Sequence, residues 1–477
     1  MEPLDMTACK AEIAASYRFA GTPGESRLVM VFLGWGMSPE PFLQLSKPGY
    51  DVMLLWGYRR GEGFDGELRR IARGYKEIVV IAWSFGVVAA SYLLEAMGDL
   101  PVTRKVAVNG TPLHIDRRRG IPPAVFNLTL RGLSEAAVEK FTARMFANNS
   151  ELDAFVAAGN SRDFNSVADE LHFFGDLPPY TGDTRWDFAV AGDRDLIFPP
   201  VSQEACWREA GVPLSVIAEA GHFIDLRRVL DDFVVDKELV ATRFSAARNT
   251  YRDSAPAQRS VAARLWELAR PHIPSGALRV LEVGVGDGLL TDLYVPELEI
   301  ADLGLMDIAG VDRGRFPAGA RFTRCDAEEA VAGLPEESVD LILSASTLQW
   351  FHSPERFVAM AYRALAPGGV MALSFFGEGT YREVADITGV SLKYPDPSRW
   401  KPEGVVLASL RETLTERFTD AAAAARHISR TGVNALRRDR ASAVAAGRKL
   451  MRCLPAEADG RVGLTYVSNY LIIRKPI

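Results

Sequence analysis

The chain is short of cysteine and contains no cysteine pair spaced for a metal or a disulfide. Its 477 residues include four cysteines, which lie far apart and form no C-x-x-C motif: Cys9, Cys206, Cys325 and Cys453. Disulfide-built secreted domains and zinc modules depend on closely spaced cysteines. We therefore expect inert thiols, with neither a disulfide framework nor a metal site.

The N-terminus also lacks the apolar stretch of a secretory signal, because acidic and basic residues interrupt its first twelve positions. The uncharged run Ile78–Leu94 is a candidate membrane span, but it contains Ser84, Gly86 and Ser91 and has no matching interfacial anchors. We interpret it as a buried α/β core. We expect a cytoplasmic protein without membrane contact.

The chain has no excess of positive charge. Its formal net charge is −6, which argues against a dedicated nucleic-acid-binding protein. A composition of 48% apolar and 24% charged residues is ordinary for a globular protein. The length predicts at least two domains. We place them at residues 1–236 and 237–477.

What the first half does contain is a strand-turn-helix signal around Ser84. An apolar run ends at Trp83, and a second apolar run that is typical of a buried helix extends to Met97. Ser84 thus falls at the sharp turn where a nucleophile elbow exposes its hydroxyl. The small residues Ala82 and Gly86 flank it, giving A-x-S-x-G in place of the usual G-x-S-x-G.

The neighbouring segments predict a parallel sheet with helices between its strands. Strands are expected at 27–33, 50–56 and 102–108, and a helix at 67–75. The first of these strands is followed by the loop Gly34-Trp35-Gly36-Met37. In α/β-hydrolases, the loop at this place supplies one N–H of the oxyanion hole. The predicted oxyanion donors are the N–H groups of Trp35 and Phe85.

An acid and a histidine follow later predicted strands. The strand at 186–192 leads into Asp193-Arg194-Asp195, and His222 follows a short strand at 214–217. Ser84, Asp195 and His222 then occur in the order Ser, Asp, His that is typical of α/β-hydrolases, with Asp193 as an alternative acid. This order predicts hydrolysis of an ester or thioester by a serine nucleophile.

Residues from about 112 to 180 change to amphipathic helical segments, at 134–147, 151–158 and 166–174. A helical insertion at this place commonly forms a lid over the serine. Its basic residues are either an ordinary solvated face or a docking patch for an acidic partner: Arg117, Arg118, Arg119, Arg131, Lys140 and Arg144.

A second strand-turn-helix signal begins the second half. The sequence Leu281-Glu282-Val283-Gly284-Val285-Gly286-Asp287-Gly288 has the form E-x-G-x-G-x-G, which differs from the G-x-G-x-x-G of dinucleotide sites. It is the form found in Rossmann-like methyltransferases that bind S-adenosylmethionine. The glycines let the backbone approach a ligand at a helix N-terminus.

Acids at the ends of the next predicted strands extend this interpretation. The strand at 298–302 ends in Asp302, suited to ribose hydroxyls, with Asp307 as the alternative; the strand ending at Asp326 supplies a partner for the adenine amine. Further strands are expected at 339–344 and 370–374. The predicted cofactor-binding residues are Glu282, Gly284, Gly286, Gly288, Asp302, Asp326 and Ser344.

Both halves resemble known families. The second half resembles the malonyl-ACP O-methyltransferases of biotin synthesis (BioC-type), through Tyr251-Arg252, the glycine loop, Ser344, Leu348-Gln349-Trp350-Phe351 and Ser374-Phe375-Phe376-Gly377. The first half resembles the pimeloyl-ACP methyl ester esterases of that pathway (BioG-type), through Phe32–Met37, Ala82–Gly86 and Gly192–Pro199.

This resemblance implies a bifunctional enzyme. With S-adenosylmethionine as cofactor, the enzyme would methylate the malonyl carboxylate on acyl carrier protein and so remove the negative charge of that carboxylate during chain elongation. Hydrolysis of the pimeloyl ester would afterwards restore the free carboxylate. A carboxylate is already ionised at neutral pH, so methyl transfer needs alignment more than a base. We therefore name no catalytic acid or base in the second half.

Two other interpretations stay open. One is a serine esterase joined to a methyltransferase for unrelated small carboxylic acids. The other is a scaffold with a decayed hydrolase half, which the presence of Ser84, Asp195 and His222 argues against.

Overall fold

The computed structural model describes residues 12–431 and 440–477, so Cys9 and the other residues before Glu12 lie outside the described residues. The chain divides into two compact units between Leu230 and Asp231. The division falls inside helix α8 (Leu226–Phe233), and the domain limits at 236 and 237 stay predictions. No helix in the described ranges combines the length and apolar character needed to cross a membrane.

The first unit is built on a seven-stranded sheet in the order β1-β3-β2-β4-β5-β6-β7. Strand β1 is antiparallel to β3, and the other pairs are parallel. The strands are β1 (Ile13–Phe19), β2 (Arg27–Phe32), β3 (Asp51–Arg60), β4 (Glu77–Trp83), β5 (Val102–Val108), β6 (Phe188–Gly192) and β7 (Leu214–Ile217).

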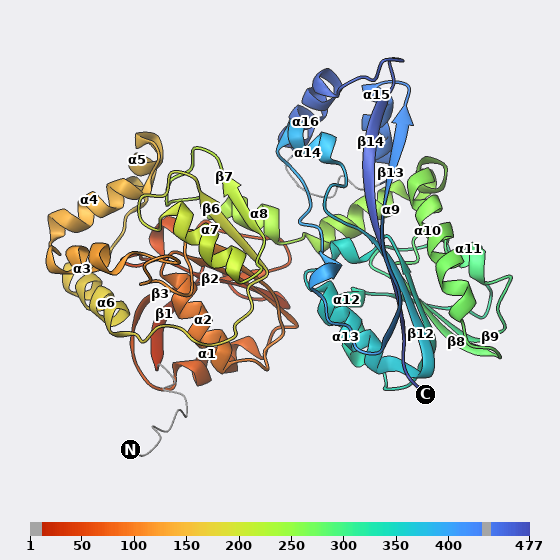
Figure 1. The fold of residues 1–477 in the computed structure, drawn as a ribbon, viewed down its shortest axis with the longest axis horizontal. Helices are drawn as coiled ribbons and strands as arrows, with labels where there is room; N and C mark the ends of the chain where they lie inside the picture. The colour runs from red at the N-terminus through yellow and green to blue at the C-terminus, as the bar shows by residue number, and fades with distance from the viewer. Residues whose placement is uncertain (1–11, 432–439) are drawn as a thin grey trace. The chain divides into compact units, whose positions relative to one another are not determined.

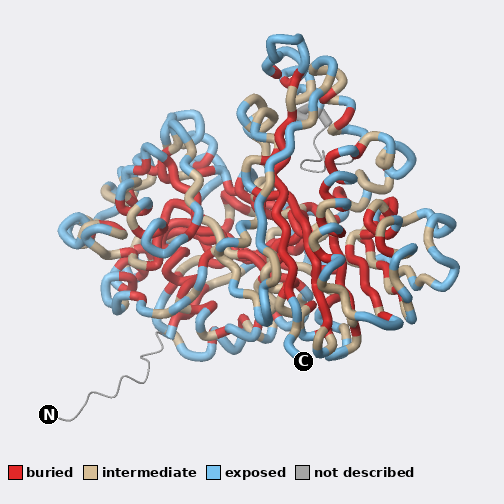
Figure 2. Tube along the Cα trace, turned by 45° about the vertical axis from the view of Figure 1, so that its right-hand side comes forward, coloured by how far each residue is buried: buried red, intermediate tan, exposed pale blue. Residues whose placement is uncertain are grey.

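Central strand β4 is buried along its whole length, as a parallel strand covered on both faces should be. It carries no charge between its first residue and Trp83, and Figure 2 shows buried strands within this unit and exposed turns between them. The helices that connect the strands are α1 (Phe64–Ala72), α2 (Gly86–Ala96) and α7 (Pro200–Glu209).

The predicted lid is present as four helices between β5 and β6. They are α3 (Pro123–Arg131), α4 (Glu135–Met145), α5 (Asn149–Ala158) and α6 (Phe164–Asp176), and Figure 1 shows them gathered at one side of the first unit. Three begin with a side-chain cap, from Ser134, Asn148 and Asp163. This unit confirms the predicted α/β-hydrolase fold with a helical lid.

The second unit contains another seven-stranded sheet, in the order β10-β9-β8-β11-β12-β14-β13. The first five strands are parallel, while β14 is antiparallel to β12 and β13. The strands are β8 (Leu278–Val283), β9 (Ile300–Asp307), β10 (Arg321–Arg324), β11 (Val339–Ala345), β12 (Leu365–Phe376), β13 (Val405–Phe418) and β14 (Val462–Arg474).

Helices cover this sheet, and a further group of helices lies at one end of its longest strands. They are α9 (Lys237–Ser254), α10 (Pro256–Ala269), α11 (Thr291–Tyr294), α12 (Ala327–Ala330), α13 (Pro354–Ala364), α14 (Arg382–Thr388), α15 (Ala421–Arg430) and α16 (Arg440–Cys453). Figure 1 shows α14, α15 and α16 together at one end of the long strands β13 and β14. The unit confirms the predicted Rossmann-like fold.

One predicted strand was misplaced. The second strand of this unit was predicted to end at Asp302, whereas β9 continues to Asp307. Asp302 pairs with Arg279 of β8 near the beginning of both strands, and the charged side chain does not end the strand.

Candidate active sites

Ser84 occupies a strained turn between β4 and α2. Its φ of +60° lies in the left-handed region that side chains other than glycine rarely adopt. The turn packs so closely that a Cβ on Gly86 would lie 2.4 Å from the carbonyl oxygen of Phe32, and one on Gly110 would lie 2.3 Å from that of Ser84. This close packing keeps Ser84 in its strained conformation. Its side chain therefore lies at the end of strand β4.

The three residues predicted for hydrolysis lie in one buried chain of hydrogen bonds. His222 Nε2 is 2.8 Å from Ser84 Oγ, and His222 Nδ1 lies 3.0 and 2.9 Å from the two oxygens of Asp195. The serine hydroxyl thus has a base beside it, and the carboxylate fixes the tautomer of that base. All three residues are buried.

Asp195 is the acid of this chain. Its Oδ1 accepts from the N–H groups of Ile197 at 2.8 Å and Phe198 at 3.0 Å, and its Oδ2 accepts from Gln203 at 3.0 Å. These donors stabilise the ionised form and orient it toward the imidazole. The alternative acid, Asp193, is exposed.

Asn109 is a residue of this site that the sequence analysis missed. At the end of β5, its side-chain amide donates to the carbonyl oxygens of Gly221 at 3.0 Å and His222 at 2.7 Å, and accepts from the N–H of Gly192 at 2.8 Å. It therefore ties the loop that carries the histidine to the end of β6. A polar residue directly after the buried strand Val102–Val108 was the available signal.

The two predicted oxyanion donors flank the serine. A Cβ on Gly34 would lie 3.1 Å from Ser84 Cβ and 3.5 Å from its Oγ, so the loop before Trp35 passes against the hydroxyl. Phe85 directly follows the serine and precedes the first helical residue. In the described residues, neither N–H donates to another backbone group. Both are available to an oxygen that develops negative charge.

The lid holds the oxyanion loop through a buried carboxylate that the sequence analysis also missed. Glu170 of α6 accepts from the N–H of Gly36 at 2.9 Å and from the N–H of Tyr58 at 2.8 Å. Arg162 lies 3.2 Å from the same carboxylate. Burial raises the pKa of Glu170, and the arginine and the two N–H donors oppose that effect.

Further hydrogen bonds join the same two segments. The indole N–H of Trp35 donates to the carbonyl of Val167 at 2.8 Å. Asn160 accepts from the N–H of Ser38 at 2.8 Å and donates to the carbonyl of Gly36 at 2.9 Å. The position of the oxyanion loop is therefore set by the lid segment as well as by the sheet.

Aromatic side chains of the lid pack around the residue after the nucleophile. The ring of Phe174 lies 4.7 Å and that of Phe126 6.2 Å from the ring of Phe85, measured between centroids. Phe141 lies 4.7 Å from Trp35. Leu128 is exposed and does not join this packing.

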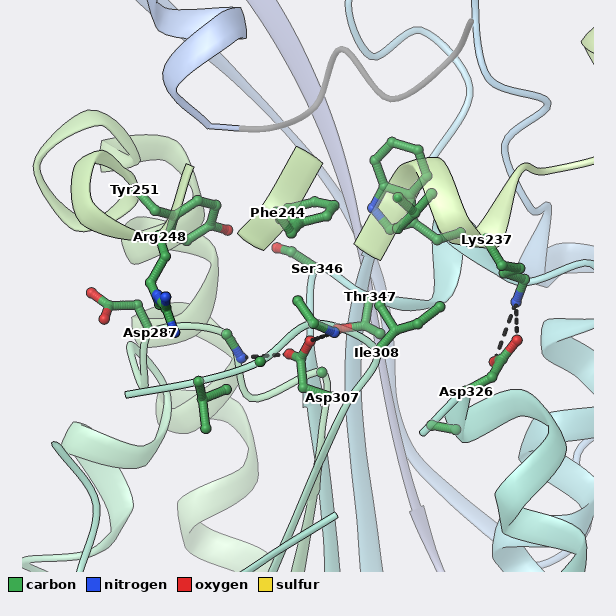
Figure 3. A pocket seen from close by; sticks show the side chains of 18 of the residues that line it. Lys237, Phe244, Arg248, Tyr251, Asp287, Asp307, Ile308, Asp326, Ser346 and Thr347 are labelled. Atoms are coloured by element: carbon green, nitrogen blue, oxygen red, sulfur yellow. Dashed lines mark hydrogen bonds and ion pairs between the residues drawn. The ribbon is translucent and has the colours of Figure 1, made fainter. Parts of the chain in front are cut away.

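In the second unit, a pocket lies where the ends of β8, β9 and β11 meet (Figure 3). Gly284, Gly286, Asp307, Asp326 and Ser346 contribute to its wall. Gly284 has a φ of +69°, and a Cβ there would lie 1.9 Å from Thr347 Oγ1. The loop therefore requires glycine to keep its backbone at the wall of the pocket.

Asp307 is the acid at the end of β9 that reaches this pocket, and the assignment of Asp302 is corrected. Asp307 accepts from the N–H of Gly286 at 2.8 Å and from that of Ala309 at 2.7 Å, as Figure 3 shows. Asp302 is half-buried, does not line the pocket and forms an ion pair with Arg321. The correction follows from the greater length of β9.

Asp326 lines the pocket from the start of α12, where its carboxylate caps the helix by accepting from the N–H of Glu328 at 3.1 Å. Lys237 of α9 lies 3.2 Å from Asp326 and 2.8 Å from the Glu328 carboxylate. This buried cation balances both acids and attaches the first turn of α9 to the pocket.

Three other predicted cofactor residues lie behind the pocket wall and support it. Glu282 is buried and accepts from Thr291 Oγ1 at 2.6 Å and Tyr294 Oη at 2.7 Å, and burial raises the pKa of its carboxyl to about 7. Ser344 donates to the carbonyl of Val283 at 2.9 Å. A Cβ on Gly288 would lie 3.0 Å from the ring of Phe316. None of the three lines the pocket among the described residues, so their direct contact with a cofactor is not supported.

Helix α9 forms the opposite side of the pocket. Val240, Phe244, Arg248 and Tyr251 follow Lys237 at helical spacing and line it, and Figure 3 shows Phe244 and Tyr251 across from Asp307. Arg248 makes no ion pair among the described residues. Of these residues, only Tyr251 was visible in the sequence as part of a family motif, because periodic spacing does not reveal which face of a helix covers a ligand site.

Known families match both units. The family model of the pimeloyl-ACP methyl esterase BioG matches residues 17–227, and a methyltransferase domain model matches residues 281–373. A malonyl-[acyl-carrier protein] O-methyltransferase of Bacteroides fragilis is 31% identical over 89% of this chain and 87% of its own length. One of Chlorobium phaeovibrioides is 33% identical over 51% of this chain and 98% of its own length.

Among solved structures, the BioG protein of Haemophilus influenzae is 26% identical to this chain. The match covers 44% of this chain and 95% of that protein, with a TM-score of 0.40.

Proposed function

Because the chain belongs to the family of the malonyl-[acyl-carrier protein] O-methyltransferases, we propose that it performs two reactions of biotin synthesis. The second unit methylates the free carboxylate of malonyl-ACP. The first unit hydrolyses the methyl ester of pimeloyl-ACP to pimeloyl-ACP and methanol. The observation that supports hydrolysis by the first unit is the hydrogen-bonded chain of Ser84, His222 and Asp195.

In the hydrolysis, the Ser84 hydroxyl attacks the ester carbonyl while His222 takes its proton. The N–H groups of Trp35 and Phe85 stabilise the negative oxygen that forms. The protonated imidazole then gives its proton to the departing methanol, and an acyl-serine is left. Water, deprotonated by the same imidazole, attacks the acyl-serine. As the bond from the acyl carbon to Ser84 Oγ breaks, the imidazole returns the proton to that oxygen, and the acid is released as its carboxylate.

The pocket of the second unit suits S-adenosylmethionine in the chemistry of its walls. Asp326 offers an acceptor for the adenine amine, and Asp307 offers acceptors for ribose hydroxyls. The cation of Arg248 suits the carboxylate of the methionine part, and Gly284 leaves the space that a side chain would fill. When bound, this cofactor supplies a methyl group on a positively charged sulfur.

This unit needs to orient the acceptor and exclude water. The carboxylate of a malonyl thioester is ionised at neutral pH, so no residue of the chain has to remove a proton. Helix α9 covers the pocket with Val240 and Phe244, which keep water from its interior.

Acyl carrier protein is the proposed partner of both reactions. Exposed basic residues of the lid offer a docking surface for an acidic carrier: Arg117, Arg118, Arg131, Lys140 and Arg144. Arg118 lies 3.6 Å from Glu209, so part of this charge is balanced within the chain. We expect esterase turnover on carrier-bound ester to fall as ionic strength rises. The expected cytoplasmic location stays a prediction.

The test uses the full chain with Ser84→Ala, which prevents hydrolysis of a newly formed ester. Mass spectrometry of malonyl-ACP incubated with this variant and S-adenosylmethionine should show the gain of one methyl group. The wild-type chain should convert pimeloyl-ACP methyl ester to pimeloyl-ACP. Methylation of free malonate at a rate equal to that of malonyl-ACP would instead favour the alternative of a methyltransferase for small carboxylic acids.

A further inference from the structure

The second unit contains another cavity, which the reaction described above does not use. Its volume is about 610 Å³, and it is formed by the end of β12, by Tyr466 of β14, by helices α14, α15 and α16, and by the segment 390–394. These helices gather at one end of the long strands (Figure 1). Much of the wall is apolar, with Phe376, Tyr394, Ile428 and Leu450 among its residues.

Trp350 lines both this cavity and the predicted cofactor pocket. Its 3-10 turn is held by the bond from its own N–H to the carbonyl of Thr347 at 3.0 Å, and its ring packs against Phe244 with centroids 5.7 Å apart. The residue is 6% exposed, and its indole N–H has no hydrogen-bond partner in the described part of the chain. Buried donors are usually hydrogen-bonded, and the position of Trp350 on both cavities makes its N–H a candidate donor to a ligand group.

A second polar group in the wall is also unsatisfied. Gln258 of α10 is 3% exposed, and one atom of its side-chain amide has no partner among the described residues. Tyr381 and Tyr466 add two hydroxyl groups, 2.8 Å apart, and Tyr466 also bonds to His427. These groups suit the amide and carbonyl groups of a ligand.

The charge of the cavity limits the ligand further. Among the described residues that line it, Lys449 is the one with a formal charge, and it is exposed. An ion with several charges would lose its hydration here without compensation. The volume is in the range of sites for ligands much larger than a three-carbon acid. A long neutral chain with amide groups fits these walls.

We propose that this cavity receives the thioester and the amide-containing arm that tethers the acyl group to its carrier, and that Trp350 donates its indole N–H to the acyl carboxylate beside the cofactor pocket. This proposal rests on the proposed function of the second unit. It places the single charge of the acceptor where the two cavities meet, beside the indole N–H of Trp350. A hydrogen bond to an ionised oxygen is stronger than one between neutral groups.

The first experiment fills the cavity. Ala446 lines it from α16, while Val444 on the same helix is exposed and does not line it, so Ala446→Phe and Val444→Phe form a matched pair. With malonyl-pantetheine as acceptor, Ala446→Phe should lower kcat/KM at least about tenfold. It should leave the affinity for S-adenosylmethionine within about twofold of wild type, and Val444→Phe should change neither quantity. Equal kcat/KM in Ala446→Phe and wild type would overturn the proposal.

Calorimetric titration with acetyl-pantetheine separates this proposal from the proposed function. This probe carries the arm and lacks the carboxylate, so it binds without reaction. Binding that is lost in Ala446→Phe and kept in Val444→Phe supports the cavity even if malonyl-ACP is not methylated, a result that would overturn the proposed function alone. Absence of binding to wild type would overturn the cavity assignment.

The second experiment removes the indole N–H and keeps an aromatic ring. Trp350→Phe should weaken kcat/KM for malonyl-pantetheine by about tenfold, the effect expected for a hydrogen bond to a charged group. Its affinity for acetyl-pantetheine should stay within about twofold of wild type. An equal loss with both compounds would mean that the ring packs against the arm and that the N–H does not bind the carboxylate.

Discussion

The two sites of this chain differ in how complete they are without a ligand. In the first unit, Ser84, His222 and Asp195 are bonded to one another, and the carboxylate accepts three further hydrogen bonds. In the second unit, Arg248 has no ion pair and the indole N–H of Trp350 has no acceptor among the described residues. The difference follows from the chemistry, because a hydrolase carries its own nucleophile, whereas a methyltransferase receives both reacting groups from its ligands.

The largest effect is expected from a substitution that breaks the hydrogen-bonded chain of the first site. Asp195→Asn should lower the esterase kcat by about 10⁴-fold, because the imidazole loses the partner that sets its tautomer. Asp193→Asn is the matched control, since Asp193 is exposed and two residues away, and should keep kcat within about twofold of wild type. Steady-state hydrolysis of pimeloyl-ACP methyl ester measures both. A large loss in the control alone would move the acid to Asp193.

The second prediction concerns the incomplete site. Asp307→Asn should weaken binding of S-adenosylmethionine by about ten- to a hundredfold, because the pocket loses a charged acceptor for hydroxyl groups. Asp302→Asn should leave the dissociation constant unchanged, because that side chain lies outside the pocket. Isothermal titration calorimetry decides between the two acids. Weaker binding in the Asp302 variant alone would restore the earlier assignment.

A third prediction tests whether the lid takes part in completing the first site. Glu170→Gln disturbs the acceptor of the Gly36 N–H without touching the triad. We expect kcat to fall about tenfold with little change in KM, since removal of a whole oxyanion donor costs more than a displaced one. Affinity for a phosphonate that mimics the tetrahedral intermediate should fall in parallel with kcat. If that affinity is unchanged, Glu170 has a purely structural role.

The smallest effect is expected for Glu282, which lies behind the pocket wall of the second unit and is expected to contribute to stability and not to ligand binding. Burial raises the pKa of Glu282 to about 7, above its unfolded value, so its contribution to stability is complete below about pH 4.5 and is lost as pH rises through 7. The free energy of urea unfolding should therefore decline less between pH 5 and 8 in Glu282→Gln than in wild type. Identical pH profiles would show that this carboxyl does not carry the expected pKa.

The sequence alone determined the features that depend on short-range order. Strand, tight turn and helix follow one another within about twenty residues at Ser84 and again at Gly284, so their pattern predicts both sites and indicates the two families whose models match. The order of Ser84, Asp195 and His222 added the roles, because parallel strands bring their carboxyl ends to one edge of a sheet.

The tertiary structure decided everything that joins distant segments. It replaced Asp302 by Asp307, since the length of β9 depends on its pairing with β8, and it identified Asn109 and Glu170, whose partners lie up to 134 residues away. It also placed Trp350 between two cavities whose walls come from six or more separate elements. A side chain's local sequence specifies its backbone, whereas the groups that surround it are selected by packing across the whole unit.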